Sequence, residues 1–340
     1  MLHSDSIHEE IHAGPSTRGI ARKCLVMTGG TNGIGRRVVE QLLAEYLDWE
    51  IILLARLSVR SRELWGMRGC DRLTVIGTDL ASLKSADRAC DDVIRSLGLR
   101  RIDALALNAG IQTVSNDAAS ADGLELAFAV NFLAHFLIVE RLKAHMRSGG
   151  RIVSTTSEVH DPEAFCLVGI GRATWQDPLL LADPVQAQMS IISKVDRGEA
   201  RYCASKLLIL MHVRHMAREM PKIGVVAYNP SVVPGTEIAR NRNWMQRFGW
   251  KFVMPLLSPI LPGTRSLKRS ATDLLWLLTE ADIQSMSGNY VDGRQVRPGS
   301  LDSQDPAKIA RSVEVAKWLI NERLYNRREQ QRTICELSPH

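Results

Sequence analysis

The chain has 340 residues, of which 45% are hydrophobic and 24% charged, values that are ordinary for a globular protein with one large or two small domains. Its six cysteines show no CxxC or other paired spacing, which argues against a disulfide framework or a cysteine metal site and favours reduced thiols in a cytoplasmic protein. The net charge of +6 comes from dispersed basic residues, so we expect no nucleic-acid partner, and peripheral membrane contact stays open. No apolar run is long enough for an integral membrane span.

Residues 1–22 carry histidines and acidic residues without an apolar core, so they are predicted to be a disordered leader and not a signal peptide. From residue 23 onward, short apolar runs typical of buried strands alternate with helix-like segments. The predicted strands are 24–28, 50–55, 73–78, 102–107, 151–156 and 223–228. The main predicted helices are a segment ending near 47 and the segments 82–97, 121–146 and 200–219. This alternation predicts an α/β fold, a doubly wound parallel sheet with helices on both faces, over residues 23–300.

Two stretches of this single domain look like additions. Residues 159–201 form an insertion before the helix at 200–219. Residues 238–263 are rich in bulky apolar side chains and are predicted to be a lid over a lipophilic substrate; a membrane-facing patch and an ordinary helix pair are the alternatives. Residues 301–340 are predicted to be a polar linker, an amphipathic helix over about 306–324 and a tail.

A glycine-rich turn, TGGTNGIG at residues 28–35, follows the first predicted strand and opens the first helix. Glycines let the backbone approach a ligand closely, and the N-terminus of the helix offers free N–H groups and partial positive charge. The pattern therefore predicts a phosphate-binding loop. Arg36 and Arg37 follow in the first helical turn, where they oppose the helix dipole; a bound diphosphate or plain solvation would each account for them.

The end of the second predicted strand indicates which nucleotide is bound. An NAD enzyme commonly has a carboxylate there for the ribose 2′-hydroxyl, whereas an arginine suits a 2′-phosphate. Here Arg56 and Arg60 follow the strand, and no acidic residue occurs before Glu63. Because a guanidinium binds phosphate in a bidentate way, we favour NADP(H) over NAD.

Tyr202 and Lys206 are four residues apart in a helix-forming run, so both side chains lie on one face of that helix. The lysine ammonium stabilises the phenolate form of a neighbouring tyrosine and makes its hydroxyl a proton donor that works near neutral pH. The pair alone is a weak signal and gains its weight from the motifs around it.

Together these motifs resemble those of the short-chain dehydrogenase/reductase family, in order and spacing, from about residue 23 to 300. The matching features are the TGxxxGxG loop, the Asn108-Ala109-Gly110 run, the YxxxK pair and single residues at 79, 131 and 157. The resemblance implies a Rossmann-type fold and a nicotinamide nucleotide, with no metal. The nucleotide-binding residues that it and the patterns above imply are Gly29, Thr31, Asn32, Gly33, Ile34, Arg56, Arg60, Asp79, Leu80, Asn108, Ala109, Gly110, Tyr202, Lys206, Val233 and Thr236.

The resemblance also implies a catalytic role for four residues. Tyr202 is expected to protonate the substrate oxygen, and Lys206 to assist it and bind the nicotinamide ribose. Ser157 is expected to hold the substrate oxygen, although Ser154, Thr155 and Thr156 are rival hydroxyls. Asn131 is expected to hold a helix and a water that relays protons. His135 is expected to be a packing residue, and His160 is a weaker candidate for facing the substrate.

Within the family, the chain is similar to the branch of protochlorophyllide reductases and retinol-dehydrogenase-like enzymes. The similarity lies in Arg56, the run 131–137, the long segment before Tyr202 and the run 317–320. Light-driven protochlorophyllide reductases carry a cysteine where this chain has Val232, and the usual Pro-Gly is Pro230-Ser231, which puts a chlorophyll-precursor substrate in doubt.

The expected function is NADP(H)-dependent hydride transfer to or from a carbonyl/alcohol of a bulky hydrophobic, cyclic small molecule. Reduction of a C=C or C=N bond in a tetrapyrrole-like or natural-product substrate is the alternative, and a regulator that binds nucleotide without catalysis is disfavoured by the intact motif residues. A monomer and a homodimer both remain open.

Overall fold

One eight-stranded sheet forms the centre of the computed structural model, which describes residues 22–112, 118–163, 173–185, 194–233 and 263–326. The order is β3-β2-β1-β4-β5-β6-β7-β8, and all neighbours are parallel except the antiparallel β7–β8 hairpin. The strands are β1 (Lys23–Thr28), β2 (Trp49–Ala55), β3 (Leu73–Gly77), β4 (Ile102–Leu107), β5 (Met146–Thr155), β6 (Gly224–Asn229), β7 (Tyr290–Asp292) and β8 (Gln295–Arg297). The predicted doubly wound α/β fold is confirmed.

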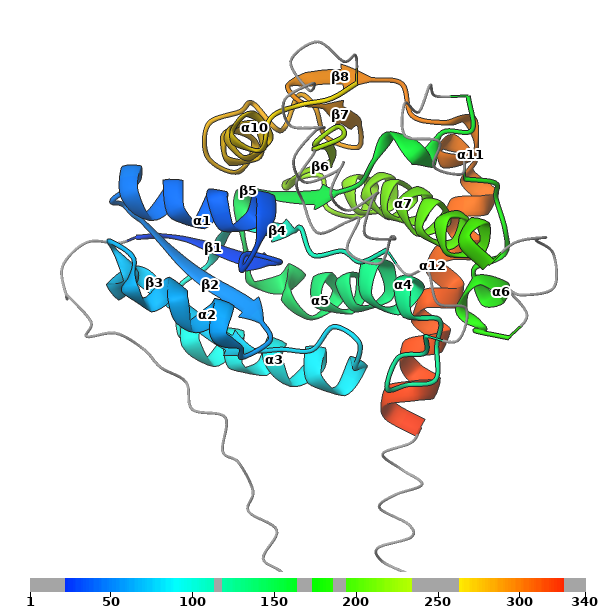
Figure 1. Ribbon diagram of the computed structural model, residues 1–340, viewed down its shortest axis with the longest axis horizontal. Helices are drawn as coiled ribbons and strands as arrows, with labels where there is room; N and C mark the ends of the chain where they lie inside the picture. Colours follow the sequence, from blue (N-terminus) through cyan, green and yellow to red (C-terminus); the bar gives the residue numbers. More distant parts are fainter. Residues whose placement is uncertain (1–21, 113–117, 164–172, 186–193, 234–262, 327–340) are drawn as a thin grey trace, which may run out of the picture.

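Helices cover both faces of this sheet (Figure 1). On one face, α1 (Gly33–Glu45) and α10 (Leu267–Thr279) pack side by side over strand residues such as Leu25 and Met27. On the other face, α3 (Leu83–Leu97), α5 (Ala134–Leu142) and α7 (Lys194–Glu219) pack over Cys24 and Val26. Successive side chains of a strand point to opposite faces, so strands buried on both sides are apolar throughout.

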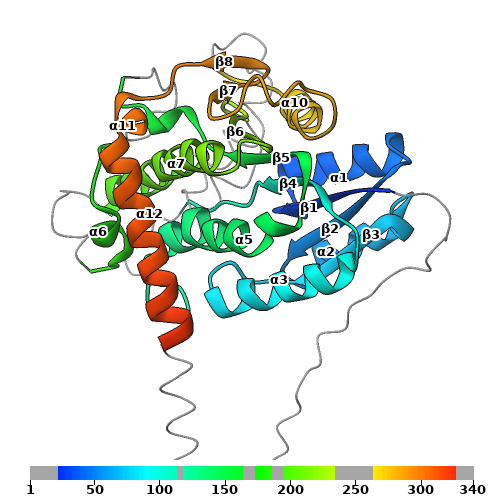
Figure 2. The same ribbon diagram turned by 180° about the vertical axis from the view of Figure 1, so that it is seen from behind.

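A second apolar core lies among helices beyond the sheet. There α12 (Pro306–Ile320) packs against α7 and against α6 (Pro178–Ala182), and Figure 2 shows it crossing this side of the molecule. Its buried residues include Ile309, Ala316 and Leu319, which recur at helical spacing. The amphipathic helix predicted near the C-terminus is thus confirmed, and its apolar face is buried within the same chain.

Several boundaries differ from those predicted. The helix expected over 121–146 is composite: α4 (Leu126–Phe128), a π-helical turn η3 (Ala129–Leu133), α5 and a 3-10 turn η4 (Lys143–His145). β5 starts five residues early at Met146, which pairs with Ile102 across a bulge. α7 starts at Lys194, within the stretch expected to be an insertion. A short helix, α11 (Leu301–Gln304), replaces the expected linker.

Short elements fill the connections on either side of the core. They are α2 (Val59–Glu63), η1 (Leu64–Gly66), η2 (Cys70–Arg72), η5 (Glu158–His160) and the π-helical η9 (Asn321–Asn326). Nearly all of the predicted leader, and of the predicted lid at 238–263, lies outside the described residues. Within the described ranges, no helix combines the length and apolar character needed to cross a bilayer.

Candidate active site

The candidate site lies along the carboxyl-terminal edge of the sheet, where β1 is flanked by β2 on one side and β4 on the other. The chain order reverses at this point, where a doubly wound sheet commonly has a crevice between loops that run in opposite directions. Doubly wound sheets bind nucleotides in such a crevice. The glycine-rich turn follows β1, and the Asn108-Ala109-Gly110 run follows β4.

The glycine-rich turn packs directly on the loop after β4. Gly29 has a φ of +71°, and a Cβ there would lie 2.7 Å from Ala109 Cα. A Cβ on Gly35 would lie 2.1 Å from the Gly29 oxygen. Only glycine fits at these two positions. Asn32 caps α1, because its Oδ1 accepts a hydrogen bond of 2.8 Å from the Gly33 N–H.

Two polar side chains hold the loops of three strands together. Asn108 Nδ2 donates to the Gly29 oxygen at 3.1 Å, and Asn108 Oδ1 accepts from Thr155 Oγ1 at 3.1 Å. Thr28 Oγ1 accepts from the N–H groups of Asn108 and Ala109, both at 3.1 Å. The ends of β1, β4 and β5 are thereby fixed relative to one another. Asn108 was predicted to contact the nucleotide, whereas the structural part of Thr28 and Thr155 was not predicted.

The predicted ribose and adenine residues lie at the ends of the outer strands. Arg56 directly follows β2 and is exposed, as is Arg60 on α2. Asp79 is exposed after β3, with Oδ1 accepting from the Ala81 N–H at 3.0 Å, and Leu80 is half-buried.

Arg36 and Arg37 have carboxylate partners within the chain. Arg36 pairs with Glu40 at 3.1 Å and with Glu63 at 2.7 Å, and Arg37 pairs with Glu40 at 2.9 Å. Glu63, the first acidic residue after β2, is thus bound to an arginine at the start of α1. Neither a diphosphate nor plain solvation is needed to account for these two arginines.

Asn131 lies in the π-helical turn that interrupts the predicted helix. Its Oδ1 accepts from the Ile111 N–H at 2.8 Å, while its Nδ2 donates to the Ile111 oxygen at 3.0 Å and to Ser205 Oγ at 2.9 Å. Ser205 Oγ in turn donates to the backbone carbonyl oxygen of Tyr202 at 2.7 Å. Asn131 therefore joins the loop after β4 to α7 between Tyr202 and Lys206. Such π-helical turns occur frequently at functional sites.

His135 links this turn to the glycine-rich loop. Its Nδ1 lies 3.0 Å from the Asn131 oxygen and its Nε2 lies 3.0 Å from Thr28 Oγ1. The carbonyl can only accept, so Nδ1 carries the proton and Nε2 accepts from Thr28. Burial lowers the pKa of His135 to about 4, so the ring is neutral near pH 7. The packing role expected for this histidine is confirmed, and its link between two site loops was missed.

Lys206 and Tyr202 come together on the buried face of α7. Lys206 is 3% exposed, and its Nζ lies 5.4 Å from the centroid of the Tyr202 ring. The same Nζ donates to the backbone carbonyl oxygen of Thr155 at 3.0 Å. Burial lowers the pKa of Lys206 to about 8. The ammonium form therefore still predominates at pH 7, next to the phenol.

Ser157 is the one half-buried hydroxyl at the end of β5, and the three rivals are buried. Thr155 donates to Asn108 as described above, and Thr156 Oγ1 donates to the Lys206 oxygen at 2.8 Å. Ser154 lies within the strand with its hydroxyl enclosed. Ser157 occupies the N-cap position of η5, which packs against α7. Only Ser157 combines access with a place next to that helix.

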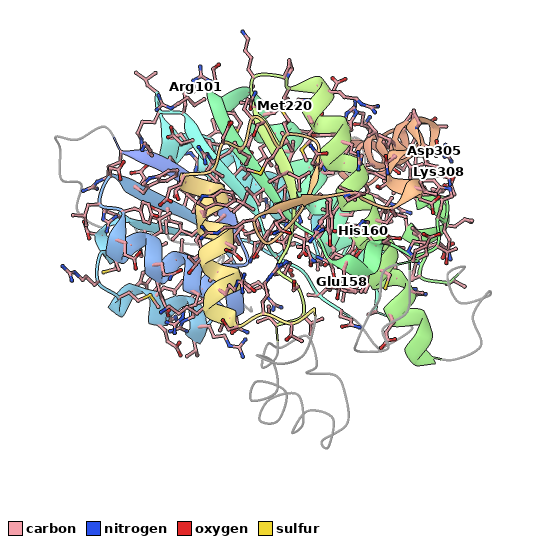
Figure 3. The ribbon with its side chains drawn as sticks, turned by 90° about the horizontal axis from the view of Figure 1, so that it is seen from above. Arg101, Glu158, His160, Met220, Asp305 and Lys308 are labelled. Atoms are coloured by element: carbon pink, nitrogen blue, oxygen red, sulfur yellow. The ribbon has the colours of Figure 1, made fainter. Side chains whose placement is uncertain are left out.

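Two acid–base residues follow Ser157 and are labelled in Figure 3. Burial raises the pKa of Glu158 to about 7, with a further upward effect of Asp292 and an opposing effect of Arg265. His160 is 1% exposed, and its Nδ1 lies 2.7 Å from the backbone carbonyl oxygen of Ser157. Its Nε2 accepts from the Ser300 N–H at 3.3 Å. His160 thus holds the Ser157 backbone against the C-terminal region. Sequence analysis did not single out Glu158.

The segment after β6 has a serine, Ser231, at a backbone position that favours glycine. Ser231 has a φ of +61°, the left-handed region, in the place where the family motif has glycine. Its N–H donates to Asn229 Oδ1 at 3.0 Å and its Oγ to Asp292 Oδ1 at 3.3 Å, which offsets part of the strain. Val233 is buried just beyond, and Thr236 lies outside the described residues.

Comparisons with known proteins report similarity to short-chain dehydrogenases. The family model for short chain dehydrogenases matches residues 23–166. Retinol dehydrogenase 13 of Homo sapiens is 27% identical over 90% of this chain and 85% of its own, and short-chain dehydrogenase iccH of Talaromyces variabilis is 25% identical over 84% and 92%. The NADPH-bound carbonyl reductase from chicken fatty liver has the same fold, with a TM-score of 0.58, 18% identity and coverage of 82% of this chain and 99% of that one. These similarities support a member of the short-chain dehydrogenase/reductase family, in its retinol-dehydrogenase-like branch.

Proposed function

We propose that the protein is an NADP(H)-dependent oxidoreductase that interconverts a carbonyl and an alcohol on a bulky hydrophobic, cyclic small molecule. The observation that carries this proposal is the Tyr202–Lys206 pair on α7, with Asn131 hydrogen-bonded to Ser205 between them. All three belong to the set that the family uses for this chemistry.

The crevice fits a nicotinamide nucleotide. A Cβ on Gly110 would lie 3.4 Å from Lys206 Nζ and 3.5 Å from Asn131 Oδ1, so glycine keeps the space beside the ammonium open. The capped N-terminus of α1 offers N–H groups to the diphosphate, with Gly29, Thr31, Asn32, Gly33 and Ile34 around it. Asp79 and Leu80 are candidates for the adenine, and Asn108, Ala109 and Val233 are candidates for contacts with the rest of the nucleotide. When bound, NADPH supplies a hydride from the nicotinamide C4.

The chain's own residues then manage the proton. In the reducing direction, the Tyr202 hydroxyl protonates the substrate oxygen as negative charge develops on it, and Lys206 stabilises the resulting phenolate. The Ser157 hydroxyl donates to the same oxygen, a preorganised interaction that strengthens as charge develops. Asn131 holds α7 and the loop after β4 at a fixed separation. The oxidising direction reverses each proton transfer.

Two features support the substrate class. One relative, retinol dehydrogenase 13, is named for retinol, which is a lipophilic alcohol with a ring. Near Ser157, Val159 and Ala173 are buried in the same apolar cluster as Tyr202. Val232, at the position of the protochlorophyllide reductase cysteine, favours carbonyl chemistry over double-bond reduction.

Arg56 supports NADP(H). It follows β2 two residues after Leu54, which pairs with Thr28 at the start of the glycine-rich turn, and no acidic side chain follows before Glu63. Arg56→Ala should therefore weaken NADPH binding by about 1.5–3 kcal/mol, the scale of a charged hydrogen bond, and leave NADH binding nearly unchanged. Fluorescence titration of both nucleotides measures this difference.

The matched control is Arg68→Ala, an exposed arginine in the same connection between β2 and β3. That variant should bind both nucleotides as the wild type does. An equal loss of NADPH and NADH affinity in Arg56→Ala would show that Arg56 does not recognise the 2′-phosphate.

A further inference from the structure

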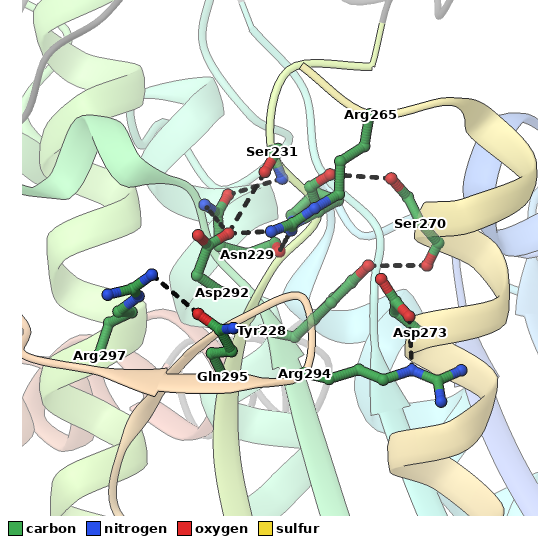
Figure 4. Close-up of polar contacts among 11 residues, drawn as sticks. Tyr228, Asn229, Ser231, Arg265, Ser270, Asp273, Asp292, Arg294, Gln295 and Arg297 are labelled. Atoms are coloured by element: carbon green, nitrogen blue, oxygen red, sulfur yellow. Dashed lines mark hydrogen bonds and ion pairs between the residues drawn. The ribbon is translucent and has the colours of Figure 1, made fainter. Parts of the chain in front are cut away.

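A pocket of about 570 Å³ lies between the start of α10 and the β7–β8 hairpin. Its lining comes from two segments, 265–273 and 292–297, and includes no residue of the glycine-rich turn or of α7. Figure 4 shows Arg294 of the hairpin reaching Asp273 on α10, whereas Arg297 is joined to Gln295 on the other side of the hairpin. The pocket is therefore separate from the nucleotide crevice described above.

Positive charge predominates in the lining. Five cationic residues contribute to it, and only Asp273 and Asp292 carry negative charge. The cationic residues are Arg265, Lys268, Arg269, Arg294 and Arg297. Counting these side chains leaves an excess of three positive charges around one hollow, which favours an anion.

Two of the guanidinium groups are held in place by the fold. Arg265 pairs with Asp292 at 2.9 Å and lies against Gly293, where a Cβ would be 2.8 Å from the Arg265 Cζ. Gly293 has a φ of +64°, so the hairpin turn needs glycine for its conformation and for this contact. Arg294 pairs with Asp273 at 2.7 Å and lies over the Trp276 ring, 5.0 Å from its centroid.

The other three cations have no carboxylate partner among the described residues. Arg297 donates to the neutral Gln295 side chain, whereas Lys268 and Arg269 are exposed residues in the first turn of α10 that line the pocket. Cations in the first turn oppose the helix dipole and cost stability. An anion in the pocket would offset that cost and the mutual repulsion of the three side chains.

We propose that this pocket binds a phosphate-bearing anion. Fixed guanidinium groups bind phosphate oxygens in a bidentate way, and Lys268 and Arg269 add the mobile charge that a doubly or triply charged group requires. A free phosphorylated metabolite and a phosphomonoester lipid headgroup share this chemistry.

Calorimetric titration of the full chain with inorganic pyrophosphate tests the proposal. Lys268→Ala/Arg269→Ala should weaken pyrophosphate binding about tenfold or more, the scale of a lost charged hydrogen bond. The matched control is Lys84→Ala/Arg88→Ala, which removes the same two charges from the exposed side of α3 on the opposite face of the sheet. An equal loss of pyrophosphate affinity in both double variants would show that the effect depends only on net charge, and this result would overturn the proposal.

A third variant separates this pocket from the nucleotide site. Asn32→Asp keeps a capping side chain on α1 and adds negative charge to the glycine-rich turn. It should leave pyrophosphate binding in the α10 pocket intact. If Asn32→Asp abolishes all binding and the Lys268/Arg269 variant changes none of it, the anion belongs to the nucleotide crevice and the proposal fails. NADPH titration of each variant reports separately on the proposed function.

Vesicle sedimentation distinguishes the two sources. Phosphatidylcholine vesicles with phosphatidic acid should bind the chain if the ligand is a headgroup, with loss in Lys268→Ala/Arg269→Ala and competition by pyrophosphate. Binding of soluble pyrophosphate without vesicle binding identifies a free metabolite. Absence of both kinds of binding overturns the proposal.

Discussion

At the residue scale, the proposed mechanism depends most on Lys206, because its ammonium would favour the phenolate form of Tyr202. The sequence predicts the Tyr202–Lys206 pair from its spacing. The structure adds that the ammonium is buried and donates a hydrogen bond to the backbone carbonyl oxygen of Thr155. The contributions of His135 and Thr155 could not be predicted, since they depend on loops from different strands meeting at one edge. Ser157 could be preferred over its three rivals only when each rival's burial and partners were known.

Burial lowers the pKa of Lys206 to about 8, which leads to a pH prediction. Below that pH the ammonium is present; above it, the charge that stabilises the phenolate is lost. The kcat/KM for NADPH, which reports groups of the free enzyme, should therefore fall as the pH rises through about 8. Steady-state rates across the pH range measure this limb.

Two variants identify the group that titrates. Lys206→Arg retains a charge at all these pH values, so its falling limb should move upward. Burial raises the pKa of Glu158 to about 7, so Glu158→Gln removes the other candidate and should leave the limb near 8. A limb that disappears in Glu158→Gln and persists in Lys206→Arg would contradict the assignment.

Among the elements, the strands were the most predictable, since β1–β4 and β6 are apolar on both faces and bounded by polar or glycine residues. The π-helical turn Ala129–Leu133 could not be predicted from the hydrophobic pattern of the sequence. All five of its residues are buried, so the extra residue in the turn does not shift any boundary between a buried and an exposed face. The early start of α7 was missed because residues 194–197, three of which are charged, resemble a loop. The β7–β8 hairpin has only three residues in each strand, too few for a recognisable alternation.

The element α12 offers a test of stability. Leu319 is 2% exposed in the helical core, whereas its neighbour Trp318 is 51% exposed. Leu319→Ala should lower the free energy of unfolding by about 2–5 kcal/mol, the cost of a cavity in a packed core. Trp318→Ala should change it by about 0.5 kcal/mol or less. Chemical denaturation of both variants measures the difference, and equal losses would mean that α12 does not pack on α7 as described.

At the scale of the whole molecule, the sheet order brings together residues that are far apart in the chain. The loops after β1, β4 and β5 meet α7 at one edge of the sheet. Residues as far apart in the chain as Gly29 and Lys206 therefore belong to one candidate site. The helical core with α12 then covers the other side of α7. Family motifs gave this arrangement in advance because each marks the carboxyl end of a strand or the buried face of a helix.

The central claim is that the Tyr202 hydroxyl transfers the proton to the substrate oxygen next to the nucleotide. Single-turnover oxidation of NADPH with all-trans-retinal and a panel of ring-bearing ketones tests it most directly. Tyr202→Phe should slow the reaction by about 100- to 10,000-fold, the usual contribution of a positioned proton donor. Tyr325→Phe, the same change at an exposed position on η9, should react at the wild-type rate. A Tyr202→Phe enzyme that oxidises NADPH as fast as the wild type would contradict the account.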